Sequence, residues 1–354
     1  MSKFLTEKYQ TLKPYVPGEQ PKERQYVKLN TNESPFPPSA KAVARAKEQL
    51  EKLMLYPDPD CKELTEAIAK EYGVSPEQII LTNGSDEVLN FAFMAYCDKS
   101  TPAVFPNITY GFYKVFAALN GVPMKELPLN KDFTVDVEAY CKERGTVFIA
   151  NPNAPTGLYL PVSEIERIVA ANPERVVVVD EAYVDFGGES CIPLIEKYDN
   201  LLVTQTFSKS RSMAGARLGF GVASKGIIED LHRIRYSTNP YNVNRTTAAA
   251  GLGAIEDGEY FRQNCETIIK NREYAANELR ALGFTMTDSA ANFLFVKHDK
   301  IEGGELYEKL KERGVLVRHF NQAEIAAYNR ITVGSLSEMQ TLVKEIKTIL
   351  EEYV

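Results

Sequence analysis

Short, almost continuously apolar segments recur through the first two thirds of the chain and alternate with segments of helical periodicity. The apolar segments are QIILTNG, PAVFPN, TVFIANP, RVVVVDEAY, NLLVTQTF and LGFGVAS. A strand that is apolar on both sides has to be covered on both faces, as strands of parallel sheets are. Helical segments between them include DEVLNFAFMAYC, PVSEIERIVAAN and CIPLIEKYD. The alternation predicts an α/β fold, in which a sheet lies between two layers of helices.

The pattern changes after about residue 250. A polar helical stretch, DGEYFRQNCETIIKNREYAANELRALG, precedes the strand-like segments ANFLFVKH, GVLVRHF and NRITVGS and a terminal helix, EMQTLVKEIKTILEEYV. A chain of 354 residues also exceeds what one core usually organises. We therefore expect an N-terminal arm (1–35) that packs with the small domain, a large domain (36–250) and a small α+β C-terminal domain (251–354).

Composition narrows the class of ligand. The net charge is −7 with both signs interspersed, so no basic stripe is available for nucleic acid. The five cysteines and three histidines are scattered without CxxC spacing, which argues against a metal site and fits a reducing compartment. No apolar run approaches the roughly 18 residues of a membrane span. We expect a soluble, cytoplasmic protein that acts on small molecules, with no nucleic-acid or membrane partner.

Ligands of open α/β sheets collect at the carboxyl ends of the strands, and two such ends carry suggestive residues. In LTNGSDEVL, Ser85 and Asp86 begin a helix whose free N–H groups could hold a phosphate, although an N-cap explains Ser85 as well. In VVVVDEAY, Asp180 ends a strand too apolar to leave a carboxylate unpaired. Its partner is either a cationic ligand or a helix cap or salt bridge within the protein.

The stretch TFSKSRSMAGARLGFG places Lys209 and Arg217 among small residues, which matter where a bulky group lies close to the backbone. Near apolar strands and another cation, the neutral amine of Lys209 would be available for a Schiff base; the alternative is a surface lysine. In ANPNAPTGLYLP, two prolines and a glycine could aim Asn151 and Asn153 at a ligand, or form only a turn.

Together these signals require a ligand with a phosphate, a ring cation and an aldehyde, which pyridoxal 5'-phosphate (PLP) provides. The motifs KLNTNESPFPPS, LYPDPDCKEL, TNGSDEVL, NPNAPTG, DEAYVDF, TFSKSRSMAGARLGFG, YNVNR and RITVG occur in family order. On these motifs the chain resembles the fold-type-I PLP-dependent aminotransferases of class II, and within them the histidinol-phosphate aminotransferases. The resemblance implies a mostly parallel, seven-stranded sheet in the large domain.

The resemblance also implies roles at the cofactor. Lys209 would bond to the cofactor's aldehyde and move the proton between the substrate carbon and the cofactor. Asp180 would pair with the pyridinium nitrogen, and Tyr183 would donate to the phenolate oxygen. Tyr110 would stack on the ring, unless it is simply a core aromatic. The residues implied at the phosphate are Ser85, Asp86, Thr206, Ser208, Arg217 and, from the neighbouring subunit, Tyr56.

One motif departs from the family pattern. The superfamily usually carries Asn immediately before PTG, where it contacts the phenolate oxygen, whereas this chain has Ala154. Asn153 would be the substitute. No role follows for Arg211, which we expect to be a solvated surface residue.

Substrate contacts are implied in the arm and the small domain. Arg330 would bind the phosphate ester of the amine donor and later a carboxylate of 2-oxoglutarate. Arg318 and Tyr15 match further phosphate contacts, with a rim ion pair and an arm anchor as the alternatives. Asn32 and Glu33 would line the entrance.

The implied reaction is transamination of L-histidinol phosphate with 2-oxoglutarate to imidazole acetol phosphate and L-glutamate, in histidine biosynthesis. It would be ping-pong through a pyridoxamine phosphate form, in a homodimer with shared active sites. Alternatives are an aromatic amino-acid aminotransferase and, less favoured, a threonine-phosphate decarboxylase. A noncatalytic PLP-fold regulator is disfavoured by the joint presence of Lys209, Asp180, Tyr183 and Arg217.

Overall fold

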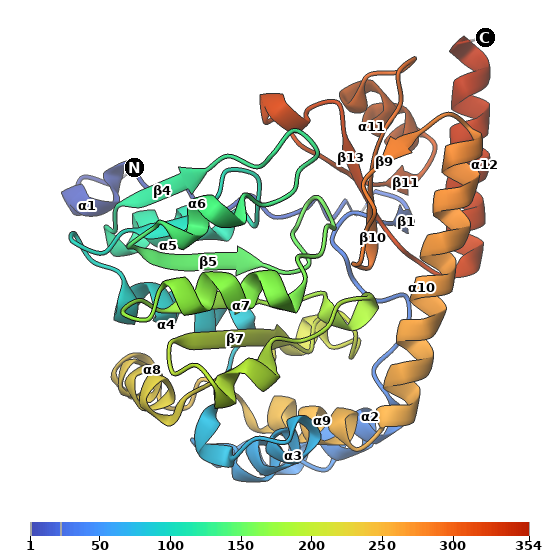
Figure 1. The fold of residues 1–354 in the computed structure, drawn as a ribbon. Helices are drawn as coiled ribbons and strands as arrows, with labels where there is room; N and C mark the ends of the chain where they lie inside the picture. Colours follow the sequence, from blue (N-terminus) through green and yellow to red (C-terminus); the bar gives the residue numbers. More distant parts are fainter. Residues whose placement is uncertain (1, 22, 354) are drawn as a thin grey trace.

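The large sheet of the protein has seven strands and confirms the predicted α/β class. The computed structural model describes residues 2–21 and 23–353. The strand order is β2-β8-β7-β6-β5-β3-β4. Figure 1 shows β4, β5 and β7 of this sheet with helices around them. The strands are β2 (Ile79–Thr82), β3 (Ala103–Pro106), β4 (Met124–Leu127), β5 (Thr146–Ala150), β6 (Val177–Asp180), β7 (Leu201–Thr206) and β8 (Gly219–Ala223).

Most neighbouring strands of this sheet are parallel, but β8 is antiparallel to both β2 and β7. The apolar segment LGFGVAS was expected to form a strand of the parallel type, and its direction differs from that expectation. Burial on both faces makes a strand continuously apolar whichever way it runs. The seventh strand, β4, lies at the sheet edge with mostly exposed residues, which explains why its sequence MKEL carried no strand signal.

Helices cover both faces of the sheet, and alternate residues of each strand face opposite layers. In β6, Val178 packs with α4 (Ser85–Tyr96), α5 (Phe112–Asn120) and α8 (Lys225–Thr238). Val177 and Val179 pack toward the opposite layer. That layer comprises α3 (Lys62–Tyr72), α6 (Val137–Cys141), α7 (Val162–Ala171) and α9 (Arg245–Ile255), with α2 (Ala40–Lys47) packed on α9. The helix expected in CIPLIEKYD is only a short 3-10 helix, Ile192–Glu196.

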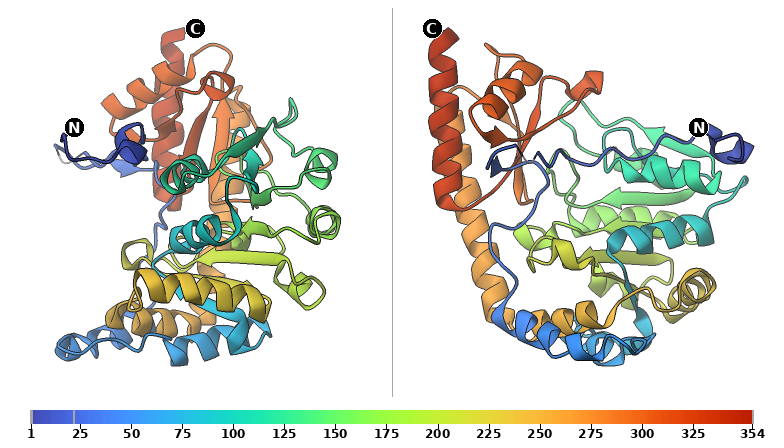
Figure 2. Two further views of the ribbon diagram at one scale, coloured as in Figure 1. Left: turned by 90° about the vertical axis from the view of Figure 1, so that its left-hand side faces the viewer. Right: turned by 180° about the vertical axis from the view of Figure 1, so that it is seen from behind.

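The C-terminal region, orange to red in Figure 2, forms a second unit. It is built around a smaller antiparallel sheet with strand order β12-β13-β10-β9. Its strands are β9 (Thr285–Met286), β10 (Phe293–Lys297), β12 (Arg318–His319) and β13 (Asn329–Thr332). Its helices are α10 (Gly258–Ala281), α11 (Gly303–Glu312) and α12 (Leu336–Leu350). Leu29 of the N-terminal arm belongs to the core of this unit, so the arm and the C-terminal region share one apolar cluster.

The N-terminal arm joins the small unit through backbone pairing. Its strand β1 (Val27–Lys28) pairs in parallel with β11 (Val315–Leu316), and the two form a separate two-stranded sheet. A short helix, α1 (Glu7–Gln10), precedes β1.

None of the helices in the described residues has the length and apolar character needed to span a bilayer. Within the same residues, no group of three or more His, Cys, Asp or Glu side chains is placed to hold a metal ion.

Candidate active site

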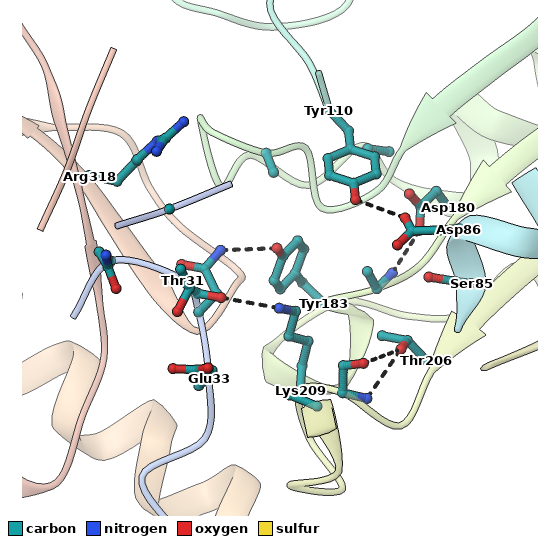
Figure 3. Close-up of a pocket in the computed structure, with 18 of the residues that line it drawn as sticks. Thr31, Glu33, Ser85, Asp86, Tyr110, Asp180, Tyr183, Thr206, Lys209 and Arg318 are labelled. Carbon is teal, nitrogen blue, oxygen red and sulfur yellow. Dashed lines mark hydrogen bonds between the residues drawn. The ribbon is translucent and has the colours of Figure 1, made fainter. Parts of the chain in front are cut away.

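One cavity of about 390 Å³ gathers side chains from the large domain, the small unit and the N-terminal arm. In Figure 3, Ser85, Asp86, Asp180 and Thr206 lie on one side, and Arg318 and Glu33 lie across from them. The large-domain residues follow strand ends, which is where the sheet rule placed them. The predicted site residues that line the cavity are Tyr15, Asn32, Glu33, Ser85, Asp86, Tyr110, Asp180, Tyr183, Thr206, Ser208, Lys209, Arg217, Arg318 and Arg330.

A cup suited to a phosphate lies at the large-domain end of the cavity. Ser85 begins α4, so its backbone N–H belongs to the first turn, which has no intrahelical acceptor. Gly84 has a φ of 81°, and a Cβ added to it would lie 2.6 Å from Arg217 Nη2. Glycine therefore lets the guanidinium approach the helix N-terminus. Thr206 and Ser208 add hydroxyls that lie 3.0 Å apart, and the cup thus combines N–H, hydroxyl and guanidinium donors.

Asp180 is almost fully buried at the end of β6, with 4% of its surface exposed. Its Oδ2 accepts a hydrogen bond from Tyr113 at 3.2 Å, and its Oδ1 accepts one from the backbone N–H of Ala182 at 3.3 Å. Burial, followed by the charge of Asp86, raises the pKa of Asp180 to about 7. A carboxyl group in this position would be stabilised as the anion by a cationic partner from the cavity.

Lys209 projects into the cavity and donates to the carbonyl oxygen of Thr31 at 3.3 Å (Figure 3). Among the described residues, no carboxylate lies within ion-pair distance of its amine; the nearby Glu33 pairs instead with Lys28. Burial, then the charge of Arg330, lowers the pKa of Lys209 to about 8. The lowered pKa increases the neutral fraction of this amine near physiological pH, and the neutral amine is the nucleophilic form.

Two tyrosines on the cavity wall have defined partners. Tyr110 donates its hydroxyl hydrogen to Asp86 Oδ1 at 2.8 Å (Figure 3). Tyr183 accepts a hydrogen bond from the side-chain amide of Asn32 at 3.0 Å. The hydroxyl hydrogen of Tyr183 is thereby left to donate to another group.

The opposite end of the cavity carries cations from the small unit. Arg330, on β13, donates to the carbonyl oxygen of Asn30 at 3.1 Å, while its buried Nε has no hydrogen-bond partner among the described residues. Arg318 donates to the carbonyl oxygen of Val16 at 3.4 Å. Tyr15 lies beside them on the cavity wall and stacks on Phe112, with 4.2 Å between ring centroids. This end can therefore receive a second anionic group.

Asn153 does not reach the cavity, contrary to the role considered for it. Its amide donates to the carbonyl oxygen of Ile108 at 3.1 Å and to the hydroxyl of Thr156 at 3.0 Å, and its oxygen accepts from Thr109 at 2.8 Å. These bonds tie the side chain to its own loop and to the loop that follows β3. Ala154 lines the cavity in its place.

Tyr56 also lies outside the cavity of its own chain. Its side chain is exposed and stacks on Tyr241, with 4.6 Å between ring centroids. The role assigned to Tyr56 requires a second subunit, and it stays a proposal.

The expectation of a solvated Arg211 is wrong. This residue is 7% exposed, donates to the carbonyl oxygen of Ala254 at 3.2 Å and lies over the rings of Phe261 and Phe207. Aromatic faces, a helix-end carbonyl and the carboxylate of Glu71, 3.9 Å from Nη2 of Arg211, stabilise the buried guanidinium. Arg211 thus anchors the loop after Lys209 to the junction between α9 and α10.

Sequence reasoning missed two residues at the site. Tyr113 is fully buried on α5, and its hydroxyl contacts Asp180. Its position in an apolar helical segment gave it the appearance of an ordinary core aromatic. Thr31 contributes its backbone carbonyl, and no side-chain pattern announces such a contact.

The family model for class I and II aminotransferases matches residues 24–346. The chain belongs to this family. Members of a family share a fold, but their substrates can differ. The activity therefore has to be inferred from the residues of the site.

Relatives of this aminotransferase extend over its full length. A histidinol-phosphate aminotransferase from Brachyspira hyodysenteriae is 45% identical over 99% of this chain and 100% of the relative. One from Marinomonas sp. is 48% identical over the same shares. The solved structure of histidinol-phosphate aminotransferase from Sinorhizobium meliloti in complex with pyridoxal-5'-phosphate superposes with a TM-score of 0.90. It is 23% identical and covers 100% of this chain and 99% of that chain, which shows the shared fold.

Proposed function

We propose that this aminotransferase transfers the amino group of L-histidinol phosphate to 2-oxoglutarate with PLP as cofactor, as a step of histidine biosynthesis. Full-length relatives at about 45% identity carry the name histidinol-phosphate aminotransferase. The structural observation that carries the proposal is a single cavity with an anion site at each end. Between them lies Lys209, whose pKa is lowered. One end suits the cofactor phosphate and the other suits the substrate phosphate.

The residues around the cavity fit PLP. The cup of Ser85, Ser208 and Arg217 would hold its phosphate, and Asp180 would pair with its ring nitrogen. Arg217 is bonded to Asp86 at 3.1 Å in the structure, so the guanidinium already faces the cup. Tyr183 would donate to the phenolate oxygen, because its own oxygen already accepts from Asn32.

PLP, when bound, supplies an electron-withdrawing ring next to the amine-bearing carbon of the substrate. The Nζ of Lys209 would accept the proton from that carbon and would serve as its carrier within the site. Asp180 would stabilise a positive charge on the ring nitrogen, and the enclosed site would strengthen that pairing. The two half-reactions use one cavity in turn, so the kinetics are ping-pong.

Arg330 is the group that would bind the donor's phosphate ester and, in the second half-reaction, a carboxylate of 2-oxoglutarate. Its Nε is buried without a partner among the described residues, and its charge lies at the end opposite the phosphate cup. Arg318 and Tyr15 would complete this anion site, while Glu33 and Asn32 line the same side of the cavity.

The proposed activity is tested with purified protein loaded with PLP and no oxo acid. L-histidinol phosphate is expected to bleach the visible absorbance of the bound cofactor, and 2-oxoglutarate is expected to restore it. Bleaching by L-phenylalanine alone would replace the proposal with an aromatic aminotransferase. Release of CO2 from L-threonine phosphate would replace it with a decarboxylase.

Arg330→Gln is expected to raise the KM for L-histidinol phosphate by about 10²-fold, because a charge-assisted contact to a phosphate is lost. Steady-state kinetics at saturating 2-oxoglutarate measure this effect. Arg313→Gln, on the far side of the small unit where Arg313 pairs with Glu345 and Glu352, is the matched control. An unchanged KM in Arg330→Gln would contradict the assigned anion site.

The proposal includes a homodimer in which Tyr56 reaches the partner's cofactor phosphate. The apolar ridge, residues 50–56, exposes Leu50, Leu53, Met54, Leu55 and Tyr56 together. An exposed apolar patch of this kind is typical of a protein interface. The end of the ridge and the loop after it are held in place. Arg245 donates to the carbonyl oxygen of Tyr56 at 2.7 Å, and the buried Arg235 donates to Asp60 at 2.7 Å.

A cytoplasmic location is also part of the proposal, and the five free cysteines suit it.

Met54→Asp, in the apolar ridge, is expected to shift the protein from dimer to monomer, because burying an unpaired charge in an interface costs several kcal/mol. Sedimentation analysis measures the mass. Leu336→Asp, an exposed leucine at the start of α12, is the matched control and should remain dimeric. A wild-type protein that sediments as a monomer at micromolar concentration would refute the shared site.

A further inference from the structure

The contact between Asn32 and Tyr183 is part of a longer chain of hydrogen bonds that continues into the small unit. The backbone N–H of Asn32 donates to Thr332 Oγ1 at 2.9 Å. The hydroxyl of Thr332 in turn lies 3.0 Å from Asn32 Oδ1. Asn32 Nδ2 then donates to the hydroxyl of Tyr183 at 3.0 Å. Thr332 is 2% exposed and is not part of the cavity lining, so it acts at a distance from any ligand.

The first member of this chain favours one direction for each bond that follows, because the hydroxyl of Thr332 already accepts one hydrogen bond. A backbone N–H can only donate, so the oxygen of Thr332 accepts and its hydrogen is free to donate to Asn32 Oδ1. With its oxygen engaged, the amide of Asn32 presents its NH₂ to Tyr183. The oxygen of Tyr183 therefore accepts, and its hydrogen is directed to another acceptor in the cavity.

The opposite orientation of the Asn32 amide would reverse this arrangement. Its oxygen would face Tyr183 and take the tyrosine hydrogen, so the cavity would lose a donor. Asn32 is held firmly, because it is 1% exposed and its carbonyl oxygen accepts from Asn292 Nδ2 at 3.1 Å. Its backbone has a φ of 55°, a conformation that asparagine tolerates better than most residues. The amide orientation is thus the one element that the side chain of Thr332 decides.

We propose that Thr332 is a positioning residue that, through the amide of Asn32, keeps Tyr183 a hydrogen-bond donor to the phenolate oxygen of the cofactor. This inference rests on the proposed function, because it needs PLP in the cavity. It also links the two parts of the protein. Thr332 lies on β13 of the small unit two residues from Arg330, whereas Tyr183 follows β6 of the large sheet.

The test is a pH titration of the visible absorbance of protein-bound PLP. The quantity compared is the midpoint, the pH at which half of the absorbance change has occurred. A donor to the phenolate oxygen weakens the hold of that oxygen on the neighbouring proton of the lysine–cofactor linkage. In Thr332→Val, which removes the hydroxyl but keeps the shape, the midpoint is expected to move up by about one pH unit. Thr332→Ser, which restores the hydroxyl, should return the midpoint to the wild-type value. Thr332→Ala is a second hydroxyl-free variant if the valine variant does not fold.

A double-mutant comparison separates positioning from a general structural effect. In the Tyr183→Phe background, Thr332→Val should cause no further shift of the midpoint, because its effect passes through the tyrosine hydroxyl. Thr146→Val is the matched control. Thr146 is a buried threonine at the first position of β5, and its hydroxyl donates to the carbonyl oxygen of Tyr96. It should lower the melting temperature without moving the midpoint.

The outcomes are distinguishable. An unchanged midpoint in both Thr332→Val and Thr332→Ala, or a shift of equal size in the Tyr183→Phe background, would overturn the role of Thr332. A wild-type protein that takes up no PLP would instead refute the proposed function on which the inference rests.

Discussion

Lys209→Ala is expected to lower the transamination rate with L-histidinol phosphate by at least about 10⁴-fold, because one side chain serves as both nucleophile and proton carrier. The structure explains why one side chain can serve in both roles. Lys209 is the cavity lysine whose pKa is lowered, to about 8, and among the described residues no carboxylate pairs with its amine. Single-turnover kinetics with excess protein measure the rate.

The control for this variant is Lys225→Ala. Lys225 begins α8 on the surface, where it pairs loosely with Glu77 at 3.7 Å. Its removal should leave the rate unchanged. A Lys209→Ala protein that still turns over within tenfold of wild type would show that another group carries the proton, and the assignment of the cavity would fail.

Asp180→Asn is expected to reduce kcat by about 10²–10³-fold, because a preorganised charge at the ring nitrogen is replaced by a neutral amide. Binding of PLP should persist, since the phosphate cup of Ser85, Ser208 and Arg217 is untouched. Fluorescence titration with PLP and steady-state kinetics measure the two quantities. Wild-type kcat in this variant would exclude Asp180 from the chemistry.

The same variant has an expected effect on the PLP-free protein. Burial raises the pKa of Asp180 from 3.8 to about 7, so the folded state keeps a proton that the unfolded state releases. Between these two values the folded state binds more protons, and its stability falls as pH rises. Wild-type melting temperature should therefore fall relative to that of Asp180→Asn between pH 4 and pH 7. Parallel melting curves across this range would contradict the raised pKa.

The fold could be predicted from the sequence where burial leaves a clear pattern. The four valines before Asp180 are apolar because both faces of β6 are covered, and both helix layers do contact them. Strand β4 escaped prediction because an edge strand needs little apolar character, and MKEL has little. The antiparallel direction of β8 leaves no trace in composition, since a central strand is buried whichever way it runs.

Residue type indicated the site where a charged or polar group follows an apolar strand. Asp180 and Lys209 were visible for that reason, and the cavity brings both together. Arg211 looked like a surface residue because sequence does not show that the rings of Phe207 and Phe261 surround it. Asn153 looked available because the sequence does not show the bonds that tie its amide to Ile108 and Thr156.

The sequence by itself determined the fold class, the family motifs and the chemical identity of the groups around the cavity. It did so because burial and backbone conformation restrict which residue types can occupy a strand or a tight turn. Only the tertiary structure decided which groups meet. The pKa of Lys209 depends first on its burial and then on Arg330, which is distant in sequence. The donor state of Tyr183 depends on Asn32 and Thr332. Electrostatic and hydrogen-bond interactions act over a few ångströms in space, and distance along the chain does not report them.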